Sequence, residues 1–89
     1  MNITSVNIKV VKNEMPVMAY CSIVIDEAFS VRKIRIISKN SEFLVCMPSI
    51  KGKDGRYSDV CHPINSSTRN KIVTAILNAY RGQLESEIA

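Results

Sequence analysis

The side chains of this 89-residue chain that could do chemistry are mainly cations, around one loop and one expected helix start. Three of them lie in the loop at residues 49–56, which also holds two glycines and one acid: Lys51, Lys53 and Arg56. Two more follow the run Asn65-Ser66-Ser67-Thr68, whose residue types are typical of a helix N-terminus: Arg69 and Lys71. Mobile cations and the unpaired N–H groups of a helix start both attract phosphate. The pattern therefore predicts a phosphate-binding surface.

The distribution of charge favours a polyanionic partner. The net charge is only +4, but the window from Val31 to Arg81 holds ten basic residues and three acidic ones. Within that window, two cations on an expected strand could extend the positive area over a sheet surface. We therefore expect nucleic-acid-binding contacts from seven residues: Lys51, Lys53, Arg56, Arg69, Lys71, Lys33 and Arg35. We also expect the cations of the loop and of the helix start to converge into a single patch.

Each of these features also has a plainer interpretation. The loop could be a solvated hairpin tip, and the two strand cations could be ordinary surface charges. The run before the helix could serve only as a cap, with Arg69 paired to Asp59. Tyr57 is the only aromatic residue close to the loop, and it could stack on an unpaired base. A packing role in the core or at a sheet edge is the commoner one for such a tyrosine.

Other chemistries find no support in the sequence. His62 and the three cysteines lack the spacing of a zinc site, and no Cys-x-x-Cys pair is present. Cys61 and His62 do not suit a nucleophilic pair, because adjacent strand residues point to opposite faces. We find no carboxylate pair at catalytic spacing and no glycine-rich phosphate loop. We therefore predict no enzyme activity, no metal or other cofactor, and no small-molecule substrate.

Cysteine usage and hydropathy predict a cytoplasmic protein. The chain has three cysteines, which cannot all pair within it, and each falls in an apolar, strand-like stretch: Cys21, Cys46 and Cys61. Such thiols behave as small hydrophobic side chains in a reducing compartment. No N-terminal signal is present, and no apolar run approaches the roughly 20 residues that cross a bilayer. We therefore expect no membrane partner.

Hydrophobic periodicity predicts five antiparallel strands and one helix. Alternation indicates strands at residues 6–10, 17–25, 29–37, 43–47 and 57–61. In the third strand, Ile34 and Ile36 should face the core, and Val31, Lys33 and Arg35 should share the opposite face. Apolar residues at helical spacing predict a helix from Ser66 to about Glu85: Ile72, Val73, Ile76, Leu77, Tyr80 and Leu84. Gly82 costs about 1 kcal/mol relative to alanine in a helix, so we expect the tail to fray.

These elements predict a single α+β domain over residues 1–89. An antiparallel five-stranded sheet occupies residues 1–63, and one long C-terminal helix with a frayed tail occupies residues 64–89. One helix covers only one face of such a sheet, and the free edges invite pairing with another chain. A small domain without disulfides also gains stability from a second subunit. We therefore expect a homodimer joined through sheet edges, with the helices packed across the joint.

The most distinctive motifs of the chain are the segments 43–49 (FLVCMPS) and 62–69 (HPINSSTR) and the turn Asp54-Gly55. They closely resemble motifs of the SpoVG family (stage V sporulation protein G) of small bacterial regulators. Weaker matches extend the likeness over nearly all of the chain: Ile3-Thr4-Ser5-Val6, the strand around Ile34-Arg35-Ile36-Ile37, and Asn78-Ala79-Tyr80. In place of the basic pair that the family usually has after Pro48-Ser49, this chain has Ile50-Lys51-Gly52-Lys53.

The resemblance implies a function as well as a fold. It implies a dimeric, sequence-tolerant DNA- and RNA-binding protein with an antiparallel sheet and a C-terminal helix. The nucleic-acid residues would lie in the loop and around the helix that follows it. The corresponding role is gene regulation linked to septation and sporulation. An alternative is a dimeric adaptor in septation or sporulation, whose basic face binds an acidic protein surface without direct nucleic-acid binding.

Overall fold

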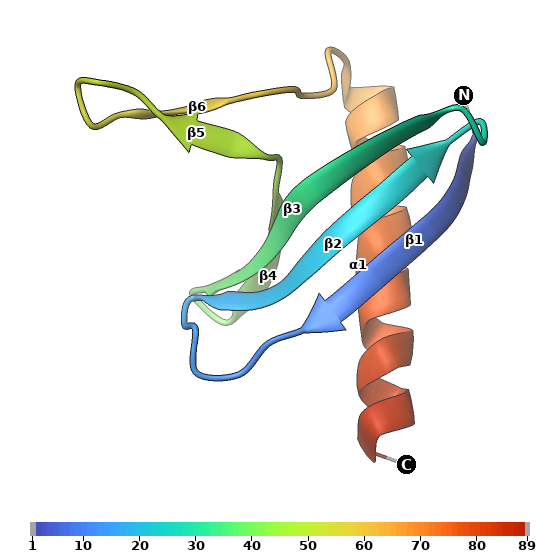
Figure 1. The fold of residues 1–89 in the computed structure, drawn as a ribbon. Helices are drawn as coiled ribbons and strands as arrows, with labels where there is room; N and C mark the ends of the chain where they lie inside the picture. The colour runs from blue at the N-terminus through green and yellow to red at the C-terminus, as the bar shows by residue number, and fades with distance from the viewer. Residues whose placement is uncertain (1, 89) are drawn as a thin grey trace.

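The main body of the protein is a four-stranded antiparallel sheet (Figure 1). The structure, a computed structural model, describes the backbone of residues 2–88 and the side chains of residues 2–85. The strands lie in chain order across the sheet: β1 (Ile3–Val10), β2 (Val17–Ile25), β3 (Phe29–Lys39) and β4 (Glu42–Cys46). Each pair of neighbours is joined by a short connection, so the sheet is built from consecutive hairpins.

Among the residues that the structure describes, a separate two-stranded ribbon and one helix follow the sheet. The ribbon pairs β5 (Ser49–Lys51) with β6 (Tyr57–Asp59), and α1 (Ser66–Ile88) follows it. Periodicity predicts a fifth strand of the main sheet at 57–61, and here the structure differs. Pro48 cannot donate to a ladder, so pairing with β3 stops after Cys46 and the chain turns out into the ribbon. The α+β class with one C-terminal helix is confirmed.

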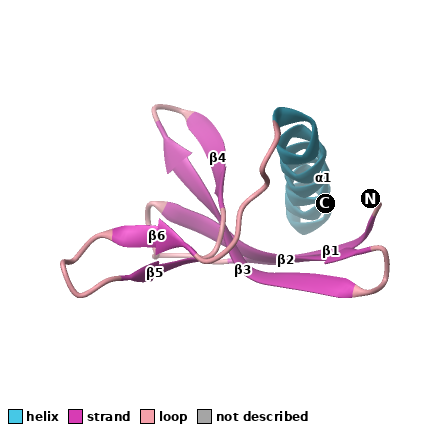
Figure 2. Cartoon of the chain, turned by 90° about the horizontal axis from the view of Figure 1, so that it is seen from above, coloured by secondary structure: helices cyan, strands magenta, loops and turns pink. Residues whose placement is uncertain are grey.

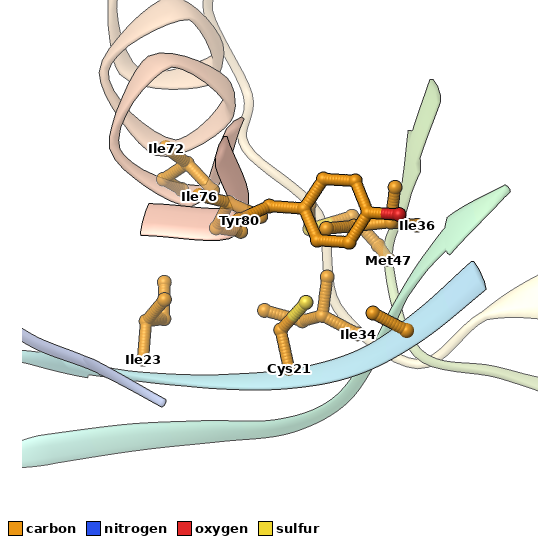
Figure 3. Close-up of a cluster of buried hydrophobic side chains, with 9 residues drawn as sticks. Cys21, Ile23, Ile34, Ile36, Met47, Ile72, Ile76 and Tyr80 are labelled. Carbon is orange, nitrogen blue, oxygen red and sulfur yellow. The ribbon is translucent and has the colours of Figure 1, made fainter. Parts of the chain in front are cut away.

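The helix covers one face of the sheet, and β4 bends up beside it (Figure 2). The core between them contains residues from two strands, the segment after β4 and the helix: Ala19, Cys21, Ile23, Ile34, Ile36, Met47, Ile72, Ile76 and Tyr80 (Figure 3). Ile34 and Ile36 are fully buried, as their alternation predicts. The Tyr80 ring meets the Phe43 ring edge to face, with centroids 5.3 Å apart and planes at 80°.

A bulge in β3 changes which residues face the core. Cys21 pairs with Ile34 but Ile23 pairs with Val31, so β3 carries one extra residue between these two pairs. The extra residue is accommodated at Lys33, whose φ is 63°. Because the bulge shifts the alternation, Val31 packs against the core and does not share the face of Lys33 and Arg35. The prediction from regular alternation, that these three residues share a face, is therefore wrong for Val31.

The helix continues through Gly82 to Ile88. Ala89 lies outside the described residues. Within the described part of the chain, no helix has the length and apolar character that crossing a bilayer requires.

The core makes a specific prediction for stability. Ile76 is 0% exposed, so replacing it with alanine should leave a cavity between the helix and the sheet. We expect the free energy of unfolding to fall by about 2–5 kcal/mol. The matched substitution Ile64→Ala, at an 88% exposed position, should change it by less than about 0.5 kcal/mol. Urea denaturation of both variants measures the difference. Equal reductions would contradict this assignment of the core.

The three thiols should differ in reactivity. Burial raises the pKa of Cys21 to about 11, so almost none of it is thiolate near pH 8, and the thiolate is the nucleophile. Cys46 and Cys61 are only partly buried. In the native protein at pH 8, iodoacetamide should therefore label Cys21 much more slowly than Cys61. In urea the two cysteines should be labelled at equal rates. Peptide mass spectrometry measures both rates. Equal native rates would mean that Cys21 is not enclosed.

Candidate nucleic-acid interface

The tip of the ribbon presents the three cations of the 49–56 segment. Its backbone is fixed by hydrogen bonds from the Gly52 N–H to the Arg56 carbonyl (2.7 Å) and from the Gly55 N–H to the Gly52 carbonyl (3.1 Å). Gly55 has a φ of 83°, which glycine adopts without strain. The Asp54 carboxylate accepts the Arg56 N–H at 3.0 Å. The tip is thus an ordered turn from which the lysine and arginine side chains extend.

The charge of this tip is hardly neutralised within the protein. Among residues 2–85 the only ion pair joins Arg56 Nε and Asp54 Oδ2 at 3.8 Å, and both side chains are well exposed (90% and 64%). Exposed pairs of this kind contribute little because water and salt screen them. The side chains of Lys51 and Lys53 are exposed and have no carboxylate partner in the described part of the chain. All three cations are therefore available to an external anion.

The ribbon also projects from the body of the protein (Figure 1). It carries exposed apolar side chains: Ile50, Tyr57 and Val60. Tyr57 is 69% exposed, so a role in the core of this protomer is wrong, whereas a role at the edge of the ribbon stays a prediction. It lies opposite Lys51 in the ladder, which places an aromatic ring beside a cation at the ribbon surface. Lys51, Lys53, Arg56 and Tyr57 therefore form one accessible group.

The start of α1 is capped by Asn65. The Asn65 side-chain oxygen accepts the Thr68 N–H at 2.7 Å, and its carbonyl accepts the Arg69 N–H at 3.1 Å. The Ser66 and Ser67 N–H groups have no acceptor among the described residues, as is usual for a first turn. An ion pair between Arg69 and Asp59, the plainer alternative, is not formed in this region. The N-terminus of α1 therefore keeps the positive electrostatic potential of the helix dipole.

A polar groove of about 830 Å³ runs beside this helix start. It lies between the first turns of α1 and the beginning of β1, and its polar lining comes from Asn2, Ser66, Ser67, Asn70, Lys71 and Thr74. Lys71 thus belongs to the groove, whereas Arg69 does not line it. The two cations of the first turns therefore lie in different surroundings.

The two strand cations lie on the face of the sheet opposite α1. Arg35 is half-buried and donates a hydrogen bond from Nη2 to the Ser49 hydroxyl at 3.4 Å, which joins the sheet face to the base of the ribbon. Lys33 is exposed at the bulge. Sequence reasoning missed two further cations on this face, Lys9 and Arg32. Strand alternation could have found Lys9, but Arg32 depends on the bulge.

The seven candidate residues therefore occupy three places. The ribbon tip and the start of α1 lie apart in both views (Figures 1 and 2), so they form two basic areas within one protomer and not one patch. The open sheet face is the third area, and Arg35 connects it to the ribbon. In the view along the helix, the ribbon continues outward roughly at the level of β1–β3. The ribbon and the open face are thus the two areas that adjoin.

The histidine and cysteines contribute no metal site in the described region. No group of three His, Cys, Asp or Glu side chains there could hold a metal ion. The His62 Nδ1 lies 3.1 Å from the Pro63 carbonyl oxygen, at the turn that leads into α1.

Comparison with known proteins gives a consistent result. A model of the SpoVG family matches residues 1–82. The chain is 41% identical over 86 residues to "Putative septation protein SpoVG" of Agathobacter rectalis, covering 97% of this chain and 99% of that one. Proteins of the same name from Geobacillus thermodenitrificans and Bacillus licheniformis are 43% and 44% identical over 90 and 80 residues. They cover 99% and 90% of this chain, and 94% and 82% of their own lengths.

The helix start predicts two opposite effects on stability. Asn65→Ala removes the cap and should lower the free energy of unfolding by about 1 kcal/mol. Arg69→Gln removes a cation from the positive end of the helix dipole and should raise it by a few tenths of a kcal/mol. Urea denaturation at low salt measures both, with Arg81→Gln as a control for removal of an exposed helical arginine. A decrease in stability in the Arg69 variant alone would indicate a structural role for that side chain.

Proposed function

Since this chain belongs to the SpoVG family, we propose that it is a cytoplasmic bacterial regulator that binds DNA and RNA as a homodimer. Binding uses the basic ribbon tip and the start of α1, with a contribution from the sheet face. The regulated process is linked to septation and sporulation, in keeping with the names of its relatives. We propose no enzymatic role, since the described residues offer no set that suggests catalysis.

The observation that carries this proposal is the excess of positive charge at the ribbon tip, where three cations accompany one exposed carboxylate. Lys51, Lys53 and Arg56 extend from an ordered turn away from the body, and the one nearby carboxylate is itself exposed and bonded to the backbone. Such side chains can displace the counterions of a phosphate backbone whatever the base sequence of the nucleic acid. Phosphate contacts position a protein on nucleic acid but do not read its sequence. The proposed binding is therefore sequence-tolerant.

The packing of α1 argues against a recognition helix in the major groove. Its apolar side is buried in the core through Ile72, Ile76 and Tyr80, and it follows a ribbon and not a second helix. A helix-turn-helix places a largely free second helix in the groove. In this protein α1 contributes its N-terminal end, where Ser66 and Ser67 present unpaired N–H groups.

The proposal of a homodimer is supported by the surfaces that one protomer leaves uncovered. The outer strands β1 and β4 each have a free edge, and the ribbon exposes apolar side chains that no part of the protomer covers. A two-stranded ribbon that packs against nothing has marginal stability, which favours its contact with a second copy of the chain. Pairing through sheet edges doubles the number of basic areas on one particle. The ribbon tip and the helix start of one protomer lie apart, but one nucleic acid could still bind several basic areas of the dimer because it can contact areas from both subunits.

The exposed apolar residues also favour the second candidate function, a dimeric adaptor. Ile50, Val60 and Ile64 are exposed in the ribbon and in the segment that leads to the helix start, the same part of the chain as the basic residues. An acidic protein surface with apolar side chains would complement that combination. The two functions differ in whether an oligonucleotide should displace the bound partner, so a competition experiment can distinguish them.

The ribbon tip predicts a change in salt dependence. The triple variant Lys51→Ala, Lys53→Ala, Arg56→Ala should bind duplex DNA weakly while its melting temperature barely moves, because the tip is exposed. The slope of log affinity against log salt should fall by about 0.9 for each phosphate that the variant leaves unneutralised. Fluorescence anisotropy at several salt concentrations measures it.

A matched control removes the same charge elsewhere. Lys12→Ala, Lys39→Ala, Arg81→Ala takes away three exposed cations that lie outside the proposed site, and it should keep a larger slope than the tip variant. Equal slopes in the two triple variants would exclude the tip as a specific binding surface. A protein partner retained from nuclease-treated lysate and not displaced by an oligonucleotide would favour the adaptor.

A further inference from the structure

We propose that the face of the main sheet opposite α1 is a platform for single-stranded nucleic acid, on which Tyr20 stacks an unpaired base. This inference rests on the proposed function and deepens it, because it names a surface and a substrate class. The surface differs from the ribbon tip and from the helix start. It also uses residues that charge distribution alone does not reveal.

The first observation is a row of side chains across the sheet. Lys9 pairs with Tyr20, and Tyr20 pairs with Arg35, so an aromatic ring stands between two cations on adjacent strands. Their sequence neighbours Ile8, Cys21 and Ile34 belong to the core side, which places the row on the other face. Tyr20 is 37% exposed although its strand lies inside the sheet. The ring is thus held in place by flanking strands while it remains accessible.

The second observation is the shape and charge of the surface around that ring. A groove of about 600 Å³ lies over this face, and it is lined in part by Lys9, Tyr20, Arg32 and Lys33. No acidic residue lines it, and none of its cations forms an ion pair among the described residues. Asn7 and Ser22 add polar groups beside the ring. A polyanion carrying flat, polar rings is complementary to such a groove in both charge and chemistry.

The third observation is the bulge that brings two of these cations together. The extra residue in β3 places both Arg32 and Lys33 along the groove, where regular alternation would send one of them to the core side. Lys33 adopts a φ of 63°, a conformation that is unfavourable for a residue with a side chain. The fold therefore maintains a strained lysine at the groove. Bulges commonly redirect side chains in this way near functional sites.

These features favour single strands over a duplex. Bases in a duplex are stacked on each other and cannot lie on a tyrosine ring, whereas unpaired bases can stack on aromatic side chains of a sheet surface. A row of cations beside the ring then follows the phosphates. Arg35 also contacts Ser49 at the base of the ribbon, so a strand leaving the platform can continue toward the cations of the tip. One strand could therefore contact both areas.

The test compares Tyr20→Ala with Tyr20→Phe. The probes are a fluorescein-labelled twelve-nucleotide oligothymidylate and a labelled duplex of mixed sequence, both read by anisotropy. Tyr20→Ala should weaken single-strand binding about 5- to 150-fold, the range expected when one base is no longer stacked, and change duplex binding less than about twofold. Tyr20→Phe keeps the ring and should bind like the unaltered protein. Circular dichroism and sedimentation establish that both variants fold and keep the same mass.

A second variant tests the groove without the risk of unfolding. Lys33→Gly removes the cation but suits the positive φ, so it should leave stability unchanged or raised. It should weaken oligothymidylate binding and lower its salt slope by about 0.7, the value for one phosphate of a single strand. That result supports a platform that contacts the phosphates as well as the base, and an unchanged slope would exclude Lys33 from it.

Several outcomes would overturn the proposal. If folded Tyr20→Ala binds oligothymidylate within twofold of the unaltered protein, the platform is excluded while the proposed function stands. If Tyr20→Ala instead halves the molecular mass, the face is an interface between copies of this chain. An unaltered protein that binds neither probe would overturn both the platform and the proposed function.

Discussion

The contact between α1 and one face of the sheet is the constraint on which the rest of the structure depends. The described residues form a single long helix, and its buried residues Ile72, Ile76 and Tyr80 all pack on the same side of β2 and β3. Burial of these side chains is the main source of stability for so small a domain. Since one helix cannot cover two faces, the opposite face remains open. That open face is where Tyr20 is flanked by cations.

Pro48 has a comparable effect on the second half of the chain. It ends the ladder of the main sheet, and its carbonyl then accepts the Val60 N–H at 2.7 Å at the base of the ribbon. The ribbon thus closes on itself and extends beyond the body, with the Gly52–Arg56 hydrogen bond at its far end. A proline at this position therefore converts what could have been a fifth strand into an arm that carries charge.

Local patterns in the sequence predict most elements but not their pairing. The alternation of Ile34 and Ile36 and the helical spacing of Ile72 to Tyr80 correctly indicate the core. Periodicity cannot say which strand a segment pairs with, so it assigns the ribbon wrongly to the main sheet. The bulge at Lys33 depends on the register between β2 and β3, which is a tertiary property. For the same reason, the sequence indicates the cations of the candidate site but not their division into three areas.

Two of the acidic residues bind backbone groups and form no ion pair with the cations of the open sheet face. Asp26 accepts the Asn2 N–H at 2.7 Å in the turn between β2 and β3, and Asp54 accepts the Arg56 N–H in the ribbon turn. Asp26 thus holds the residue before β1 to the β2–β3 turn, and Asp54 fixes the ribbon turn. Among residues 2–85 the cations of the groove have no ion pair, and their mutual repulsion opposes folding. Folding alone gives no reason for this arrangement, whereas a bound polyanion would turn the repulsion into attraction. The unpaired cations of the open face therefore support the proposal of a polyanionic ligand.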